Sequence, residues 1–185
     1  MVSEFVHVYR DDITDRHALG FWDILCANGR AQTFFYDREN MTAEGFLRWF
    51  RQGELHPWIT LFRGRPFALM ALNGIKGKRA WGHFAFLPCG VTRTERRMSA
   101  QQGAVLSMLA TWLYALGPDG EHPIDHVYGL TPETNRPAVH LVKRMSGNSI
   151  TTLPGFCYMA ELKKNVGGIV TMHSRETVPA EAREY

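Results

Sequence analysis

Apolar side chains recur along this chain with two periods, and each period predicts one kind of element. Spacings of three and four residues, typical of an α-helix, predict helices over about residues 15–28, 42–53, 99–116 and 135–148. Alternating or short continuous apolar runs predict strands over about residues 4–10, 58–62, 66–72, 79–87, 124–130, 149–153 and 156–163. The predicted order is therefore strand, two helices, three strands, helix, strand, helix and two strands.

Local signals support several of these boundaries. Thr42 precedes the second helical segment and is a good N-cap residue. The Gly117-Pro118 pair should end the long third helix, because proline cannot continue it. Gly64 and Asn73-Gly74 suit the turns of an antiparallel meander, and Pro154-Gly155 is expected to join the last two strands as a hairpin.

This order predicts a mixed α/β (α+β) fold, with a largely antiparallel central sheet flanked by helices. One connection requires a parallel pair: the helix over 99–116 joins a strand ending near Leu87 to a strand beginning near Ile124. We expect residues 1–165 to form a single domain and residues 166–185 to form a partly loose, polar C-terminal tail.

Composition narrows the class of protein. A chain of 185 residues with 45% hydrophobic and 21% charged side chains is globular rather than disordered or fibrous. The net charge of +3 indicates no strong polyanion partner. The nearest approach to a basic cluster, formed by Arg93, Arg96 and Arg97, is too small to indicate nucleic-acid binding. The three separated cysteines favour a reducing compartment.

The histidines and carboxylates show no spacing typical of metal ligands, so no metal site is expected. The N-terminal segment has no apolar signal region, and no apolar run reaches the roughly 20 residues that a membrane span needs. We therefore expect a cytoplasmic protein without a membrane partner.

Two signatures surround the expected crossover. After the strand over 124–130 come Asn135, Ala138 and Leu141 at intervals of three residues, followed by Gly147 and by Pro154-Gly155. Before it, the strand over 82–88 leads through a basic loop into the helix over 99–116. Over about residues 4–165 this arrangement resembles the GNAT superfamily of acyl-CoA-dependent N-acyltransferases.

The resemblance implies acetyl-CoA, or another acyl-CoA, as co-substrate, and direct acyl transfer to the amine of a small-molecule or protein acceptor. A helix N-terminus suits a pyrophosphate, since it offers unpaired N–H groups and a partial positive charge. The family's phosphate pattern overlays on Arg97, Ala100 and Gln102, but neither glycine position holds a glycine, and Gly103 follows one residue later. We expect a phosphate site formed by Arg97, Ala100, Gln101, Gln102 and Gly103. The alternatives are a solvated arginine loop and a helix-packing role for Gly103.

Family members have parallel strands that separate at a β-bulge, where the pantetheine arm pairs with the exposed edge of the first strand. The resemblance places that edge at the backbones of Phe86 and Leu87. Asn135 either hydrogen-bonds the cofactor or caps the helix that follows it.

Catalysis needs a base for the amine and an acid for the leaving thiolate. The tyrosine that many members place directly after the signature leucine is Val142 here, so Tyr128 and His140 are the candidate acids. His83 is the candidate base, because its ordinary pKa near 6.5 leaves it neutral at pH 7. Alternatively, Tyr128 only packs within the sheet and His140 only faces solvent.

An aromatic cluster is expected to shape the acceptor pocket, although such clusters are more often core; its members are Phe34, Phe35, Tyr36, Trp22, Trp49 and Trp58. Two other functions stay open. One is a non-catalytic GNAT-like binding protein, suggested by the missing glycines and by Val142. The other is a GNAT-like enzyme that modifies a nucleic-acid base, which the weak basicity disfavours. Homodimer formation is also left open.

Overall fold

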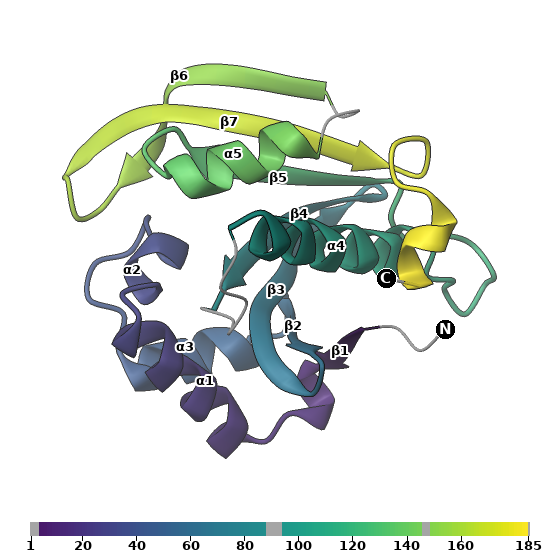
Figure 1. The fold of residues 1–185 in the computed structure, drawn as a ribbon, viewed down its shortest axis with the longest axis horizontal. Coiled ribbons are helices and arrows are strands. Elements are labelled where there is room, and N and C mark those ends of the chain that lie inside the picture. The colour runs from purple at the N-terminus through teal and green to yellow at the C-terminus, as the bar shows by residue number, and fades with distance from the viewer. Residues whose placement is uncertain (1–3, 88–93, 146–148, 185) are drawn as a thin grey trace.

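Seven strands form one sheet in the order β1-β2-β3-β4-β5-β7-β6 (Figure 1). The structure, a computed structural model, describes residues 4–87, 94–145 and 149–184. The strands are β1 (Phe5–Tyr9), β2 (His56–Phe62), β3 (Arg65–Lys76), β4 (Arg79–Phe86), β5 (His126–Pro132), β6 (Ser149–Met159) and β7 (Lys164–Ser174). Among these described strands, β4 and β5 are the one pair that runs parallel. The expected mixed, largely antiparallel sheet with one parallel crossover is confirmed.

Helices cover both faces of the sheet (Figure 1). They are η1 (Arg10–Asp12), α1 (Asp15–Ala27), α2 (Ala31–Phe34), α3 (Ala43–Arg51), α4 (Thr94–Leu113), α5 (Arg136–Arg144) and η2 (Ala180–Glu184). The expected cap of α3 is confirmed, because the Thr42 hydroxyl accepts a hydrogen bond of 3.0 Å from the N–H of Gly45. The short elements η1, α2 and η2 were not expected.

Two apolar cores lie on opposite sides of the sheet. Successive side chains of a strand point to opposite faces. Met70 and Leu72 of β3 therefore pack in the core that contains α4, whereas Leu69 and Ala71 pack in the core that contains α1 and α3. Full burial of a leucine or methionine side chain contributes about 1.5–3 kcal/mol to folding. The sheet is thereby held as a rigid platform between two helical layers.

The expectation of a loose tail over residues 166–185 is wrong. Strand β7 lies inside the sheet, between β5 and β6, and η2 packs against α4 with Val178 and Ala182 completely buried. The sequence of β7 hides this position. Two glycines and the polar residues Thr171 and His173 weaken its apolar pattern, although both polar side chains are buried.

The expected hairpin at Pro154-Gly155 is also wrong. Both residues lie within the single strand β6, where the register with β7 shifts between Leu153 and Cys157. Two features make this conformation acceptable. Strand β6 is at the sheet edge, so the missing N–H of Pro154 costs no ladder hydrogen bond. Gly155 adopts a φ of 65°, which glycine tolerates.

Helix α4 begins and ends earlier than the sequence indicated. It starts at Thr94 rather than near Ser99, and it ends at Leu113, so that Leu116 is largely exposed. Arg96 and Arg97 therefore belong to the first turn of the helix instead of a preceding loop, whereas Arg93 lies outside the described residues. The segment contains no glycine or proline that would delay the helix.

Arg175, at the end of β7, ties the C-terminal segment to the crossover. Its Nη1 donates to the carbonyl oxygens of Leu113 at 2.8 Å and Ile124 at 2.9 Å. Its Nη2 also pairs with Asp125, and this hydrogen bond is the main reason that the pKa of that carboxyl is lowered. One guanidinium thus joins the end of β7 to α4 and to the segment just before β5.

Replacing Arg175 with alanine removes the donor from two backbone carbonyls. We expect the free energy of unfolding, measured by urea titration, to fall by about 2 kcal/mol. The matched control is Arg16→Ala on the exposed side of α1, which should change stability by less than about 0.5 kcal/mol. Equal effects of the two substitutions would contradict this role for Arg175.

Candidate functional site

The candidate site lies where β4 and β5 separate. The two strands pair at only three positions, from Arg79 with His126 to Trp81 with Tyr128. Beyond these positions β4 continues to Phe86 and β5 to Pro132, but the two strands no longer pair with each other. The expected divergence of the parallel strands is thus present. In the pairing of β4 with its other neighbour, β3, the register shifts between Asn73 and Lys76.

The divergence leaves one edge of β4 without a strand partner. The N–H of Leu87 donates to the carbonyl oxygen of Phe67 at 2.8 Å, so it points toward β3. Because successive N–H groups of a strand point to opposite edges, the N–H groups of Phe84 and Phe86, beyond the last paired position, point toward the gap. Buried backbone groups of this kind need hydrogen-bond partners. The free edge is therefore suited to an extended ligand that carries amides.

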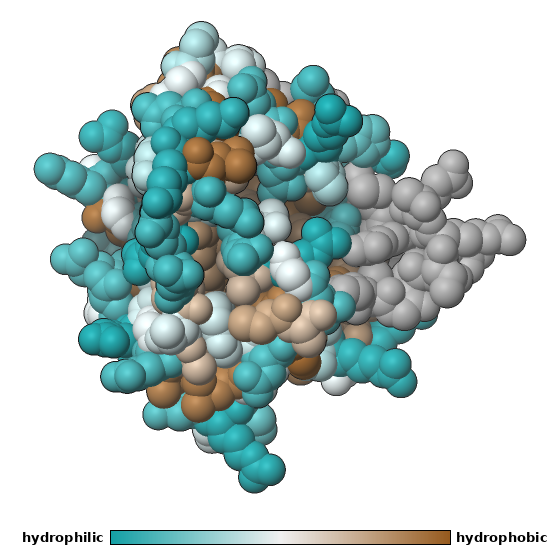
Figure 2. All heavy atoms as spheres, turned by 90° about the vertical axis from the view of Figure 1, so that its left-hand side faces the viewer, coloured by the Kyte–Doolittle hydropathy of each residue, from teal (hydrophilic) through white to brown (hydrophobic). Residues whose placement is uncertain are grey.

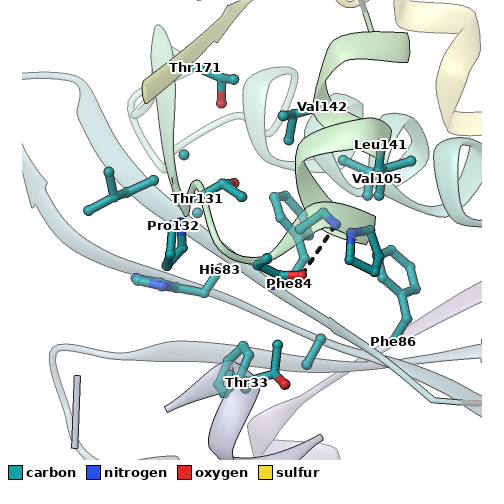
Figure 3. Close-up of a pocket in the computed structure, with 18 of the residues that line it drawn as sticks. Thr33, His83, Phe84, Phe86, Val105, Thr131, Pro132, Leu141, Val142 and Thr171 are labelled. Atoms are coloured by element: carbon teal, nitrogen blue, oxygen red, sulfur yellow. Dashed lines mark hydrogen bonds between the residues drawn. The ribbon is translucent and has the colours of Figure 1, made fainter. Parts of the chain in front are cut away.

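A cavity of about 340 Å³ occupies this gap and continues on both sides of the sheet. Figure 3 shows its walls, with Thr33 and His83 at one end and Leu141, Val142 and Thr171 at the other. Figure 2 shows brown apolar surface set among teal polar residues on the face that holds α2 and the β6–β7 turn. The lining residues come from five regions: Arg30, Thr33, Phe34 and Tyr36; Gly82, His83, Phe84, Ala85 and Phe86; Gln101 and Val105; Gly129, Leu130, Thr131, Pro132, Asn135, Pro137, Ala138, Leu141, Val142 and Met145; Thr171 and His173.

His83, the expected base, lines this cavity from β4. Its Nε2 lies 3.2 Å from Oδ1 of Asn73, and since a carbonyl oxygen only accepts, Nε2 carries the proton. The lone pair is then on Nδ1. Burial lowers the pKa of His83, and the charge of Asp37 opposes that shift. The imidazole is neutral at pH 7 and has one nitrogen able to accept a proton.

The other two candidate catalytic residues lie away from the cavity. Tyr128 is half-buried on β5, with its ring 5.7 Å from that of Trp81, and it is not among the lining residues. His140 is exposed on α5. Val142, at the position of the family's tyrosine, does line the cavity. In the structure, therefore, Tyr128 packs within the sheet and His140 faces solvent.

The expected phosphate residues lie in the first half of α4. Arg97 is in its first turn, and its side chain lies outside the described residues. Gln101 lines the cavity, whereas Ala100 packs against the core and Gln102 is half-buried. A Cβ added to Gly103 would lie 3.2 Å from Cε2 of Phe5, so this glycine permits close packing of α4 on β1. In the structure, therefore, Gly103 has the helix-packing role.

Asn135 lines the cavity and also caps α5, since its Oδ1 accepts a hydrogen bond of 3.3 Å from the N–H of Ala138. That bond is the dashed line in Figure 3. Phe86 lines the cavity from β4, as expected. Leu87 does not: it is buried in the core beside α1 and α3, and its N–H is bonded to β3.

The aromatic cluster divides between core and cavity. Phe34 and Tyr36 line the cavity, whereas Trp22, Phe35 and Trp49 are buried in the core. The carbonyl oxygen of Tyr36 accepts a hydrogen bond of 2.8 Å from the N–H of Ala160, which ties the segment after α2 to the β6–β7 turn.

Sequence reasoning missed the polar residues that β7 contributes. Thr171 and His173 line the cavity, and the His173 side chain is only 4% exposed. Its Nδ1 has no hydrogen-bond partner among the described residues, and burial lowers the pKa of His173 to about 4. The alternation of Val170, Thr171, Met172 and His173 was the only available signal, and it was assigned to the tail.

Other kinds of site are less well supported. Within residues 4–87, 94–145 and 149–184, no three or more His, Cys, Asp or Glu side chains form a group that could hold a metal ion. None of the described helices is both long enough and apolar enough to cross a membrane.

Comparison with known proteins identifies the fold. No family model and no curated protein matches the sequence. Solved structures do. Spermidine N-acetyltransferase from Vibrio cholerae in complex with CoA and spermine is 11% identical, with a TM-score of 0.65 over 95% of this chain and 98% of that chain.

Two further structures agree over similar lengths. AAC(6')-Ib in complex with ribostamycin and CoA is 8% identical, with a TM-score of 0.67 over 95% of this chain and 96% of that one. The acetyltransferase from Salmonella typhimurium that modifies the N-terminal serine of ribosomal protein L7/L12 is 10% identical, with a TM-score of 0.66 over 92% and 95%. The strand order, the single parallel pair and these matches together show that the chain has the GNAT fold.

Proposed function

We propose that this chain is an acyl-CoA-dependent N-acyltransferase, which transfers an acetyl or other short acyl group to an amine acceptor. The observation that carries the proposal is the free edge of β4 beside the cavity, with α4 covering one end of the gap. Structural neighbours with bound CoA support acetyl-CoA or a related thioester as the co-substrate. The acceptor is a small molecule or a protein that carries an amine.

The pantetheine arm of the thioester contains two amides and is extended, so it can pair with the edge of β4 like an added strand. The N–H groups of Phe84 and Phe86 are the donors on the protein side. The pyrophosphate then lies toward the N-terminal end of α4, where unpaired helix N–H groups and the helix dipole favour an anion. Arg97, in the first turn, adds a positive charge at that end.

The amine approaches from the opposite side, past Thr33 and Phe34 toward His83. Nδ1 of His83 takes a proton from the ammonium, and the neutral amine nitrogen attacks the thioester carbonyl carbon. A C–N bond forms, the C–S bond breaks, and the sulfur leaves with the electron pair and takes up the proton that the newly acylated nitrogen loses. The neutral state of His83 at pH 7 makes it able to accept that proton.

A second function is favoured by one observation. Val142 lines the cavity where many related enzymes have a tyrosine that protonates the thiolate, and valine cannot donate a proton. A protein that binds acyl-CoA without turning it over would have the same edge and cavity. Acyl transfer to any member of a broad panel of amines separates the two functions.

Filling the cavity should weaken co-substrate binding. Ala138 is a half-buried lining residue on α5, so Ala138→Trp should reduce acetyl-CoA affinity at least tenfold in a calorimetric titration. Arg136→Trp, an exposed neighbour on the same helix, is the control and should bind normally. If both variants bind acetyl-CoA as the wild type does, the cavity is not the co-substrate site.

The charge of Arg97 should matter for the phosphates. Arg97→Ala should weaken CoA binding about fivefold, because one charge-assisted contact is lost, and the loss should shrink at high salt. Arg16→Ala, on the exposed face of α1, is the matched control. Equal CoA affinity of the two variants would place the phosphates elsewhere.

The base role of His83 gives a pH dependence with a definite sign. Burial lowers the pKa of His83 below 6.5, so the base is neutral and active above that pKa and is lost as the pH falls through it. We expect an acidic limb in log kcat/KM below pH 6.5, measured by thiol release with the best amine of the panel. His83→Gln should lower kcat/KM about 100-fold and remove the limb. A limb that persists in His83→Gln, with His17→Gln as the exposed control, would exclude His83 as the base.

A further inference from the structure

The wall of the cavity has one fixed charge, and that charge is positive. Among the described residues that line the cavity, Arg30 is the one with a charged side chain, and no aspartate, glutamate or lysine accompanies it. Burial lowers the pKa of both lining histidines, His83 and His173, so their imidazoles are neutral at pH 7. A charged group on a ligand in this cavity therefore meets a guanidinium in the wall and no carboxylate.

The guanidinium of Arg30 has no role in holding the fold. Of the four half-buried arginines that the structure describes, the other three serve the fold. Arg10, Arg51 and Arg175 donate to backbone carbonyl oxygens, and each also pairs with an aspartate. The guanidinium of Arg30 makes no hydrogen bond or ion pair with any described residue. Its nitrogens keep accessible surface, so a ligand can reach them.

Arg30 lies at the end of the cavity where we place the amine acceptor. The N–H of Phe34 donates to the carbonyl oxygen of Arg30 at 3.0 Å, so the two residues are one helical turn apart and share a face with Thr33. All three line the cavity. The ring of Phe34 packs edge-on against that of His83, with 6.4 Å between their centroids, and Figure 3 shows Thr33 and His83 at the same end. The guanidinium thus flanks the approach to the proposed base.

A negative charge acts on the base itself. Asp37, just beyond α2, does not line the cavity, but its carboxylate favours positive charge at His83. An ammonium that approaches His83 is therefore stabilised by Asp37. A second ammonium near Arg30 would be repelled, whereas a carboxylate there would be attracted and could accept two parallel hydrogen bonds from the guanidinium. The two charges suit a dipolar acceptor rather than a polyamine.

We propose that the acceptor is an amino acid, whose amine faces His83 and whose carboxylate pairs with Arg30. This proposal rests on the proposed acyltransferase function and names the substrate class of its acceptor end. The amine is acylated as described above, the carboxylate is unchanged, and the product is an N-acyl amino acid. Arg30 is accordingly a specificity-determining residue.

The test compares matched acceptors with the intact protein and acetyl-CoA, followed by thiol release. The common amino acids, β-alanine and 4-aminobutyrate are each paired with the corresponding carboxamide, which keeps the amine and nearly the same shape but has no negative charge. For the best amino acid, kcat/KM should exceed that of its carboxamide about tenfold or more, as one bidentate charge-assisted contact predicts.

Arg30→Ala should lower kcat/KM for the amino acid about tenfold and leave that of its carboxamide within about twofold. Arg38→Ala, an exposed arginine in the segment after α2, is the matched control and should keep the preference. An equal loss for both acceptors in Arg30→Ala would indicate a structural role and overturn the assignment. Calorimetric titration with CoA should give Arg30→Ala the wild-type affinity. A loss of about fivefold or more would assign the guanidinium to the phosphates and also overturn it.

The outcomes separate this inference from the proposed function. If the wild type acylates none of these acceptors, nor spermidine, nor a peptide with a free N-terminus, the acyltransferase function fails and the inference fails with it. If amines are acylated but no amino acid exceeds its carboxamide, or if spermidine or the peptide is the best acceptor, only the inference is overturned. These wild-type comparisons decide the question even if Arg30→Ala does not fold.

Discussion

The hydrogen bonds that β4 does not make to β5 determine most of what this structure can do. Pairing ends after Trp81 and Tyr128, yet both strands continue and stay within a sheet that two helical layers hold in place. The remaining N–H groups on that edge of β4 are fixed in position, partly shielded from water and unpaired by any strand. A rigid sheet therefore offers a row of donors to an extended, amide-bearing ligand at little cost in conformational entropy.

The alternation of β4 gives the two sides of this edge different chemistry. His83 points to the side of α1 and α3, where Asn73 sets its tautomer, whereas Phe84 and Phe86 pack beside α4. A thioester in the gap is consequently exposed to a neutral base on one side and to apolar walls on the other.

The sequence predicted the parts that depend on local patterns. Thr42 caps α3, and the order of strands and helices around the crossover led to the GNAT fold and to His83 and Phe86, both of which line the cavity. The errors have physical causes. Strand β7 contains two glycines and two buried polar side chains, so its burial comes from its tertiary position rather than from an apolar pattern. Thr171 and His173 reach the cavity only because β7 inserts between β5 and β6, and local sequence does not encode that insertion.

The central claim is that the free edge of β4 holds the co-substrate through its backbone. Amide hydrogen exchange, followed residue by residue by NMR with and without CoA, tests it most directly. Bound CoA should slow exchange at Phe84 and Phe86, whose N–H groups face the gap, and should leave Leu87, already bonded to Phe67, unchanged. Saturation with CoA that leaves the exchange of Phe84 and Phe86 unaltered would contradict the account.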